Sequence, residues 1–126
     1  MYNYNENEFA VFWIEDEILF FEYKPNIIID LAAAQQIVTD RLRIQNGKAY
    51  PILCDIRGII DSDKAARDYL AQHGSVLTKA VGIIFTNQKS LSLLMITFYL
   101  RINKPQVPTK VFTDKTVALE FLKTFI

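Results

Sequence analysis

The sequence predicts an α/β fold built on a mixed five-stranded sheet, and two patterns carry that prediction. Short apolar runs alternate with amphipathic helical segments through most of the chain, which is typical of parallel strands joined by right-handed helical crossovers. The first two apolar runs are instead separated by a short polar turn, which indicates an antiparallel hairpin. We therefore expect the order β-β-α-β-α-β-α-β-α, with four helices, one antiparallel pair and the other strands parallel.

The predicted hairpin pairs Phe9–Ile14 with Ile18–Tyr23 across the turn Glu15-Asp16-Glu17. Aromatic and β-branched residues, which favour strands, fill both runs. Nearly every position is apolar, whereas a half-exposed strand would alternate apolar and polar residues. Both faces of the hairpin should therefore be covered, either by helices or by a second copy of the chain. The candidate contacts of such a homodimer are Phe9, Val11 and Trp13.

A helix is predicted after Pro25, which breaks the chain behind the hairpin. Asp30 is a favourable N-cap for a helix that begins near Leu31. Asn46-Gly47 should end this helix, because both residues tolerate the left-handed conformation at a helix C-terminus. The apolar residues that recur at helical spacing are Leu31, Ala34, Val38 and Leu42.

Three further strand–helix units follow along the chain. The predicted strands are Tyr50–Ile56, Ala80–Thr86 and Thr109–Phe112. The predicted helices are Ser62–His73, Ser90–Ile102 and Lys115–Phe125. No internal repeat or second domain is visible, so we expect residues 1–126 to form a single domain, with residues 1–7 as a flexible N-terminal tail.

Composition and charge exclude several classes of function. The 126 residues are 51% hydrophobic and 22% charged, which is typical of a globular domain that buries a core. Fourteen basic residues balance fourteen acidic ones, so no net charge attracts nucleic acid or an anionic membrane. The start of the chain lacks the basic and apolar regions of a signal peptide, and no apolar run is long enough to span a membrane. We expect a cytoplasmic protein without a nucleic-acid partner.

The sequence contains no motif that indicates catalysis, a metal site or a cofactor. Cys54 and His73 are the only residues of their types, so they are the only candidates for a thiol–imidazole pair. Cys54 lies inside an apolar strand and His73 at a predicted helix C-terminus, where structural roles are expected. A single Cys and a single His exclude a structural zinc site. We therefore expect a non-enzymatic protein with no cofactor.

Four polar residues follow predicted strands, at the edge where open parallel sheets bind ligands. Asp55 and Arg57 follow the third strand, Ser62 opens the next helix, and Asn87 follows the fourth strand. These residues could form a ligand or partner loop in which Asp55 aims Arg57 at an anion. The interpretation we favour is structural, with Asp55 and Arg57 in a local ion pair or turn and Asn87 in a second turn.

Three stretches of the chain resemble STAS and SpoIIAA-like domains. They are "ILCDIRGI" (Ile52–Ile59), "AARDYLA" (Ala65–Ala71) and "NKPQVPTKVFTDKTVALEFL" (Asn103–Leu122). Together with the element order, the resemblance covers almost the whole chain, which is similar to a small family of uncharacterised bacterial SpoIIAA-like proteins. Bacterial anti-sigma-factor antagonists and regions of sulfate transporters share this fold. The resemblance implies a SpoIIAA-like fold and a protein partner.

The resemblance also places Ser62 at the position of a regulatory residue. In the anti-sigma-factor antagonists, a kinase phosphorylates a serine or threonine at this helix start, and the added charge switches partner binding. The Ser-Gly pair that follows that residue in the family is absent here, and Asp63-Lys64 stand in its place. Because Asp61 and Asp63 oppose a further negative charge, we favour Ser62 as an N-cap over Ser62 as a phospho-switch.

The predicted Ser90–Ile102 helix carries an unusually wide apolar stripe. Such a stripe usually packs on the sheet, but Met95, Phe98 and Tyr99 within it could also line an apolar pocket. We thus expect an interaction domain that binds a protein partner or itself. The alternative is a carrier of a small apolar or amphipathic ligand, held between the sheet and the Leu91–Ile102 helix.

Overall fold

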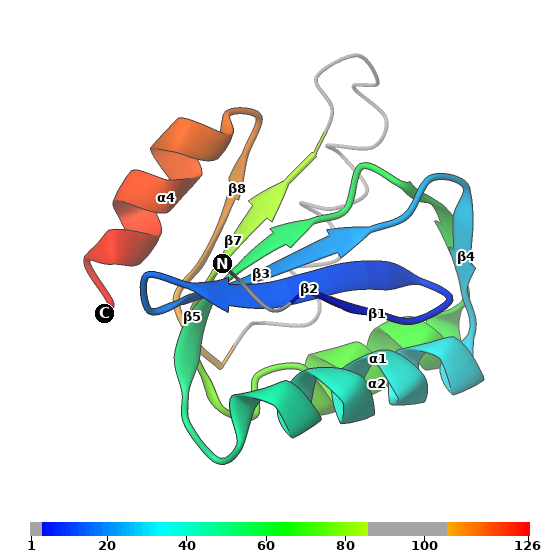
Figure 1. Ribbon diagram of the computed structural model, residues 1–126. Coiled ribbons are helices and arrows are strands. Elements are labelled where there is room, and N and C mark those ends of the chain that lie inside the picture. The colour runs from blue at the N-terminus through cyan, green and yellow to red at the C-terminus, as the bar shows by residue number, and fades with distance from the viewer. Residues whose placement is uncertain (1–3, 86–105) are drawn as a thin grey trace.

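The computed structural model describes residues 4–85 and 106–126, and a six-stranded mixed sheet organises them (Figure 1). The strands lie in the order β1-β2-β3-β5-β7-β8. The antiparallel strands are β1 (Asn5–Glu6), β2 (Ala10–Glu15) and β3 (Ile18–Tyr23). The strands that continue the sheet in parallel from β3 are β5 (Tyr50–Asp55), β7 (Thr78–Ile84) and β8 (Thr109–Phe112). The predicted mixed sheet with an antiparallel hairpin and parallel strands is confirmed, but the prediction of one antiparallel pair was wrong, because β1 adds a second.

The hairpin of β2 and β3 turns through only two residues, Asp16 and Glu17. Both have positive φ angles, 52° and 66°, as in a type I′ turn, whose twist matches that of the flanking strands. The turn sets a register in which Trp13 lies opposite Phe20 and Phe12 opposite Phe21. Each face of the hairpin therefore carries a pair of neighbouring aromatic rings.

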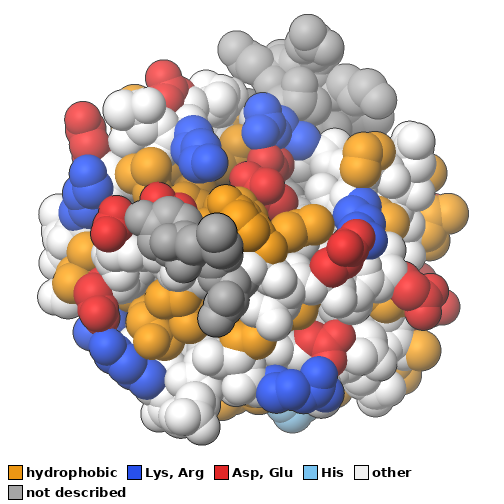
Figure 2. Space-filling model, viewed as in Figure 1, with side chains coloured by type: hydrophobic (Ala, Val, Ile, Leu, Met, Phe, Trp, Pro, Cys, Tyr) orange, Lys and Arg blue, Asp and Glu red, His pale blue; other side chains and the backbone are white. Residues whose placement is uncertain are grey.

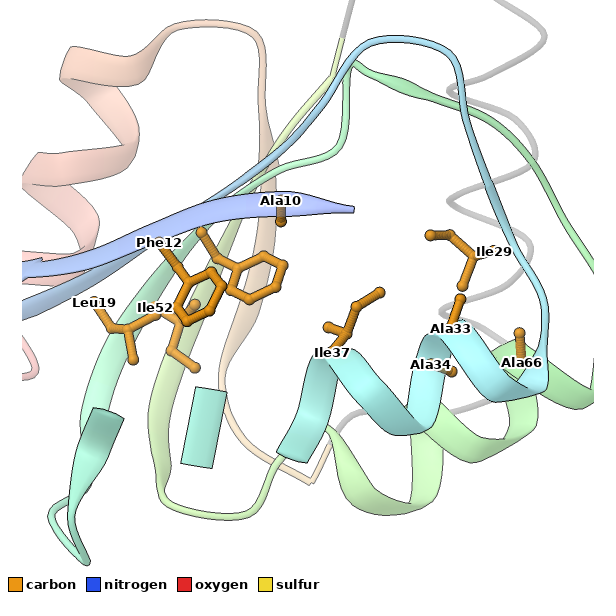
Figure 3. Packing of buried hydrophobic residues seen from close by; sticks show 10 residues of the cluster. Ala10, Phe12, Leu19, Ile29, Ala33, Ala34, Ile37, Ile52 and Ala66 are labelled. Atoms are coloured by element: carbon orange, nitrogen blue, oxygen red, sulfur yellow. The ribbon is translucent and has the colours of Figure 1, made fainter. Parts of the chain in front are cut away.

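Helices of the same chain cover both faces of the hairpin. The helices within the described residues are α1 (Leu31–Gln45), α2 (Lys64–His73) and α4 (Lys115–Lys123). The first two lie side by side under one face, and α4 covers the other (Figure 1). Figure 3 shows Phe12 and Ile52 pointing from the sheet toward Ile37 of α1. On the opposite face, Trp13 belongs to the apolar cluster that includes Leu122 of α4.

The prediction of five strands was wrong, because the structure contains three strands that the sequence did not predict. Asn5–Glu6, expected in a flexible tail, form β1 and pair with β2. The strands β4 (Ile27–Ile29) and β6 (Ile59–Ser62) form a separate two-stranded parallel sheet. This sheet lies at the right of Figure 1, where β4 is labelled. These strands contain two, three and four residues, which is too short for an apolar periodicity to be recognised.

Two helices begin where the sequence predicts. The carboxylate of Asp30 accepts a hydrogen bond from the backbone N–H of Ala33 at 2.8 Å, and α1 ends before Asn46, whose φ is 49°. The helix α4 begins at Lys115 as expected, capped by Asp114. The fourth predicted helix, Ser90–Ile102, lies outside the described residues. Within residues 4–85 and 106–126, no helix is long and apolar enough to span a membrane.

The buried face of α1 differs from the predicted apolar stripe. Ala34 and Val38 are buried as expected, whereas Leu31 at the start of the helix is exposed and Leu42 is only partly buried. Three polar side chains are buried in their place, at Asp40, Arg41 and Gln45. The helix is therefore rotated so that these polar groups meet hydrogen-bonding partners from distant parts of the chain.

Arg41 joins α1 to the loop between α2 and β7. Its guanidinium donates hydrogen bonds to the carbonyl oxygens of Val76 at 3.0 Å and Gly74 at 3.3 Å, and to the side chain of Gln45. Gln45 in turn donates to the carbonyl of Leu77 at 2.7 Å. Burial lowers the pKa of Arg41, but a guanidinium keeps its charge in proteins. The loop carbonyls therefore solvate a buried positive charge.

Candidate functional site

The carboxyl ends of the parallel strands meet at one edge of the sheet. Asp55 is the last residue of β5 and lies beside Glu22 of β3 in the parallel register. The helix α4 starts after β8 at the same edge, and the Lys115 Nζ atom lies 3.9 Å from a Glu22 carboxylate oxygen. This edge, where open parallel sheets commonly bind ligands, thus carries charges of both signs.

Asp55 and Arg57 form a compact ion pair at this edge. The Asp55 carboxylate accepts the backbone N–H of Arg57 at 3.0 Å, the Nε–H at 3.0 Å and an Nη2–H at 2.6 Å. The hydrogen bonds and charge of Asp55 raise the pKa of Arg57. The Arg57 side chain is 56% exposed and that of Asp55 only 14%. Asp55 thus fixes the turn and holds an exposed guanidinium in one orientation.

Gly58 directs the chain out of the sheet into β6. A Cβ atom at this position would collide with the backbone carbonyl of Lys24, which follows β3. The carbonyl of Gly58 accepts a hydrogen bond from the N–H of Ile27 at 2.9 Å. Because the two backbones can approach this closely only without a side chain, Gly58 anchors the β4–β6 pair to the end of β3.

Ser62 is not the N-cap of α2, contrary to our prediction. It is the last residue of β6, in parallel register with Ile29, and the cap is Asp63. The Asp63 carboxylate accepts the backbone N–H of Ala66 at 2.8 Å. The N–H of Asp63 itself donates to the carbonyl of Ile29 at 3.1 Å. Pairing with β4 therefore keeps Ser62 in the strand and moves the helix start to Lys64.

The Ser62 hydroxyl has a basic neighbour in α2. The Arg67 Nη1 atom lies 3.2 Å from the Ser62 hydroxyl oxygen and also donates to the Ser62 backbone carbonyl. Asp61 is nearby, but its carboxylate accepts the backbone N–H of Ser62 at 2.8 Å. The Ser62 hydroxyl therefore lies within hydrogen-bonding distance of the Arg67 guanidinium, while the Ser62 backbone is held by its pairing with β4.

The structure brings only some of the predicted site residues together. Asp55 and Arg57 are in contact at the end of β5, and Ser62 lies farther along the same segment, in the β4–β6 pair. The remaining members of the predicted loop and pocket lie outside the described residues: Asn87, Met95, Phe98 and Tyr99.

Cys54 and His73 lie toward opposite ends of the fold. Cys54 is near the carboxyl end of β5, whereas His73 ends α2, which returns the chain to the start of the next parallel strand. Burial, with the Asp55 charge as a second cause, raises the pKa of the Cys54 thiol to about 12. The His73 ring instead packs on Tyr69, with centroids 4.4 Å apart. The two groups do not form a nucleophile–base pair.

Comparison with known proteins identifies the family. Residues 12–126 match a family model described as a domain of unknown function, DUF7793. The chain belongs to this family. No curated protein sequence matches the chain.

A solved structure is similar to this DUF7793 chain over nearly its whole length. It is an uncharacterised protein of the DUF3478 family with a SpoIIAA-like fold, from Shewanella loihica. The TM-score is 0.61, and the match covers 97% of this chain and 92% of the other at 17% sequence identity. At this identity the similarity concerns the fold alone, and it confirms the predicted SpoIIAA-like fold for the DUF7793 chain.

The predicted dimer contacts of the DUF7793 chain differ in their burial. Trp13 is only 7% exposed, because it stacks on Phe20 with ring centroids 5.0 Å apart and contacts the ring of Tyr4 at 4.9 Å. Phe9 and Val11 are partly buried. Trp13 therefore stabilises the fold of one chain, and Val11 is the better position at which to test self-association.

The exposed isoleucines of β4 and β6 were missed in the sequence. Ile28 is 60% exposed and Ile60 is 62% exposed. Each lies in a short isoleucine run that is followed at once by an aspartate, "IIID" at residues 27–30 and "IID" at residues 59–61. Adjacent isoleucines ordinarily indicate a buried strand, so neither run carries a sequence signal that marks its middle residue as exposed.

Proposed function

We propose that this DUF7793 chain is a non-enzymatic interaction domain that binds a protein partner at the segment Asp55–Ser62. The observation that carries the proposal is how this segment is held. Its polar side chains are engaged within the chain, Asp55 with Arg57 and Ser62 with Arg67, while Ile60 is exposed to solvent. A rigid segment with satisfied polar groups and an exposed apolar side chain suits binding better than acid–base chemistry.

The chemistry of the other candidate residues supports a non-enzymatic role. With its pKa raised to about 12, the Cys54 thiol is protonated at neutral pH and is a poor nucleophile. The Asp55 carboxylate binds an arginine two residues away through three N–H groups, so its charge is already neutralised. A catalytic base needs a lone pair directed at a substrate, and most of the lone pairs of Asp55 are engaged by Arg57, which makes Asp55 a weak candidate for this role.

Site-specific photo-crosslinking tests the proposal. A benzoyl-phenylalanine at position 57 replaces an exposed side chain on the segment, and the same residue at position 117 replaces the exposed Val117 on α4 as a control. In cells that naturally express the chain, we expect position 57 to form a covalent adduct with a defined protein and position 117 to form none. Equal labelling at both positions, or no protein adduct at position 57, would contradict the proposal.

Self-association through the hairpin is the second form of binding that we propose to test. Val11 lies in β2 on the same face of the hairpin as the covered Trp13, and its side chain is partly buried by neighbours of the same chain. We expect Val11→Glu to lower the mass in solution from dimer to monomer without a change in helix content. A wild-type protein that stays monomeric at high micromolar concentration would exclude this interface.

A ligand carrier is the alternative function, and one observation favours it. Val81 and Ile83 lie on one face of β7, a strand with neighbours on both sides, yet their side chains are only partly buried. An apolar ligand on this face would complete their burial. Native mass spectrometry of the purified chain is the test. A bound apolar molecule supports the carrier, whereas an unliganded mass throughout argues against it.

A phospho-switch at Ser62 is favoured by the position of Arg67. A phosphate on the Ser62 hydroxyl would form inside hydrogen-bonding reach of the Arg67 guanidinium, now 3.2 Å away. Asp61 and Asp63 oppose the added charge, as the sequence predicts. Intact-mass analysis of protein from its native cells under several growth conditions decides the question. Only unmodified Ser62 under all of them would exclude the switch.

A further inference from the structure

We propose that the exposed isoleucine surface of the β4–β6 pair docks a protein segment whose apolar side chains are flanked by Lys or Arg. We call this surface the isoleucine surface; its residues are Ile28 and Ile60. The proposal deepens the proposed function, on which it rests, because Ile60 belongs to the Asp55–Ser62 segment. It specifies where on that segment the partner lies and what chemistry the partner carries.

A β-bulge places an acidic residue beside the exposed isoleucines. The register of β4 and β6 pairs Ile27 with Ile59 and then skips to Ile28 with Asp61. Ile60 is therefore an extra residue, and both Ile60 and Asp61 face away from the core with Ile28. Without the bulge, the alternation of a regular strand would turn Asp61 inward. The bulge thus places two isoleucines, each about 60% exposed, next to an acidic side chain.

The sheet edge adds backbone groups to this apolar surface. The β4–β6 pair is a sheet of only two strands, so each strand has one neighbour within the described part of the chain. Short exposed edges with apolar side chains are unusual, because such edges recruit other chains. In Figure 2, hydrophobic side chains reach the right-hand margin of the molecule, where β4 lies, and acidic side chains lie beside them.

The charges around the surface decide the chemistry of the occupant. Asp30, Asp61 and Asp63 are exposed at its rim, and each accepts a backbone N–H hydrogen bond. Over the described residues, none of these three carboxylates forms an ion pair. The basic side chains nearby are engaged elsewhere, since Lys64 binds Asp68 at 2.7 Å and Arg67 donates to Ser62. The rim is therefore negative and complements a basic partner.

The same charges disfavour other occupants. In a two-fold symmetric dimer, the same patch meets itself, so the carboxylates of Asp30, Asp61 and Asp63 would face their own copies across the interface. An anionic membrane or a nucleic acid would meet the same repulsion. A segment that pairs apolar side chains with Lys or Arg buries the isoleucines and neutralises the rim together. We therefore assign the surface to a basic, apolar protein segment.

The test places a photo-crosslinker on the surface and then uses the captured segment as a probe. Benzoyl-phenylalanine replaces Ile60, with Val76 as the control, because Val76 is also an exposed apolar residue but lies in the loop before β7. The crosslinked segment is identified by mass spectrometry, and a synthetic peptide of that sequence is titrated into the full chain by calorimetry. We expect the segment to contain apolar residues beside Lys or Arg.

Two variants make the titration decisive. Ile60→Asp should weaken peptide binding at least tenfold, and Asp61→Asn should weaken it severalfold and reduce its dependence on salt. Both side chains are exposed, so neither substitution should destabilise the fold. Thermal midpoints of the two variants close to that of the wild type will check that the fold is intact. A captured segment without basic residues, capture of a second copy, or affinities unchanged by both variants would overturn the proposal. Adducts from position 57 without adducts from position 60 would overturn it and leave the proposed function standing.

Discussion

Replacing Arg41 should destabilise the fold far more than replacing its near neighbour Arg43 on the same helix. Arg41 is buried and donates to the carbonyls of Gly74 and Val76 in the loop before β7. Arg43 is 71% exposed, and the ion pair that it forms within the described residues is with Asp40, at 3.1 Å. The two variants Arg41→Met and Arg43→Met remove the same functional group from the two environments, so their difference measures what burial and the loop contacts contribute.

The expected magnitude follows from the lost contacts. A hydrogen bond to a charged group contributes about 1.5–3 kcal/mol, and Arg41 forms two with loop carbonyls. Removing a buried charge recovers part of its desolvation penalty, and the Thr78 hydroxyl remains within reach of both carbonyls, at 3.2 and 3.4 Å. We therefore expect a net loss of about 3 kcal/mol. The Arg43 guanidinium is itself exposed, and its Asp40 partner keeps hydrogen bonds from Gln36 and Asn7 when Arg43 is replaced. We therefore expect Arg43→Met to cost about 1 kcal/mol.

Urea denaturation at neutral pH measures both effects. For a small protein with a urea m-value of about 1–3 kcal/mol per molar, Arg41→Met should lower the midpoint by about 1–3 M, and Arg43→Met by about a third of that or less. The m-value should stay at its wild-type value, because the surface area that becomes exposed on unfolding is nearly unchanged. A midpoint shift for Arg41→Met no larger than that for Arg43→Met would refute the role of Arg41 as the link between α1 and the loop.

Three more predictions concern a buried carboxylate, a glycine and the thiol. Burial raises the pKa of Asp40, but hydrogen bonds from Gln36 and Asn7 and the nearby arginine outweigh it, so the net pKa is lowered; the stability it provides is present above about pH 4 and lost as pH falls through the folded-state value. Asp40→Asn should therefore destabilise the fold at pH 7, and the difference in urea midpoint between variant and wild type should shrink as the pH falls below about 4. A difference that stays constant as the pH falls would contradict the pKa shift. Gly58→Ala should lower the thermal midpoint by several degrees, because its methyl group meets a backbone carbonyl; an unchanged midpoint would disprove the close approach. With its pKa near 12, Cys54 should react with iodoacetamide at pH 8 far more slowly than free cysteine, and an equal rate would show an accessible thiolate.

The sequence alone could predict the elements whose own residues determine them. The β2–β3 hairpin follows from two apolar runs and a short turn, and the limits of α1 follow from Asp30 and Asn46, which act within one turn of the helix ends. The parallel sheet follows from the repeated order of strand and helix. Each of these signals comes from residues close together in the sequence, and the structure contains the element that each one predicts.

The features of the fold that the sequence did not predict depend on contacts between residues far apart in the sequence. Ser62 and Asp63 are both good helix caps, and the pairing of β6 with β4 decides between them. Asp40 and Arg41 appear in the sequence as residues for an exposed helix face. Asn7 reaches Asp40 from 33 positions away, and the carbonyl of Val76 meets Arg41 from 35 positions away. No periodicity in α1 itself contains that information.

In the candidate site, too, the features set by neighbouring residues could be predicted and those set by long-range pairing could not. The Asp55–Arg57 ion pair is local and could be anticipated, whereas the isoleucine surface could not, because adjacent isoleucines ordinarily indicate a buried strand. The bulge in β6, fixed by its register with β4, turns Asp61 outward beside Ile60. A short strand in a two-stranded sheet leaves apolar side chains exposed that a central strand would cover.

Chemical-shift mapping of the partner segment on the isotope-labelled chain tests most directly whether the Asp55–Ser62 segment is a binding site. The peptide recovered by crosslinking is titrated into the full chain, and backbone amide shifts are followed residue by residue. We predict that the largest shifts fall on residues 55–63 and 27–31, with little change in α4 at Lys115–Lys123. Largest shifts on α4 or on the strands of the six-stranded sheet, with residues 55–63 unmoved, would contradict the proposed function.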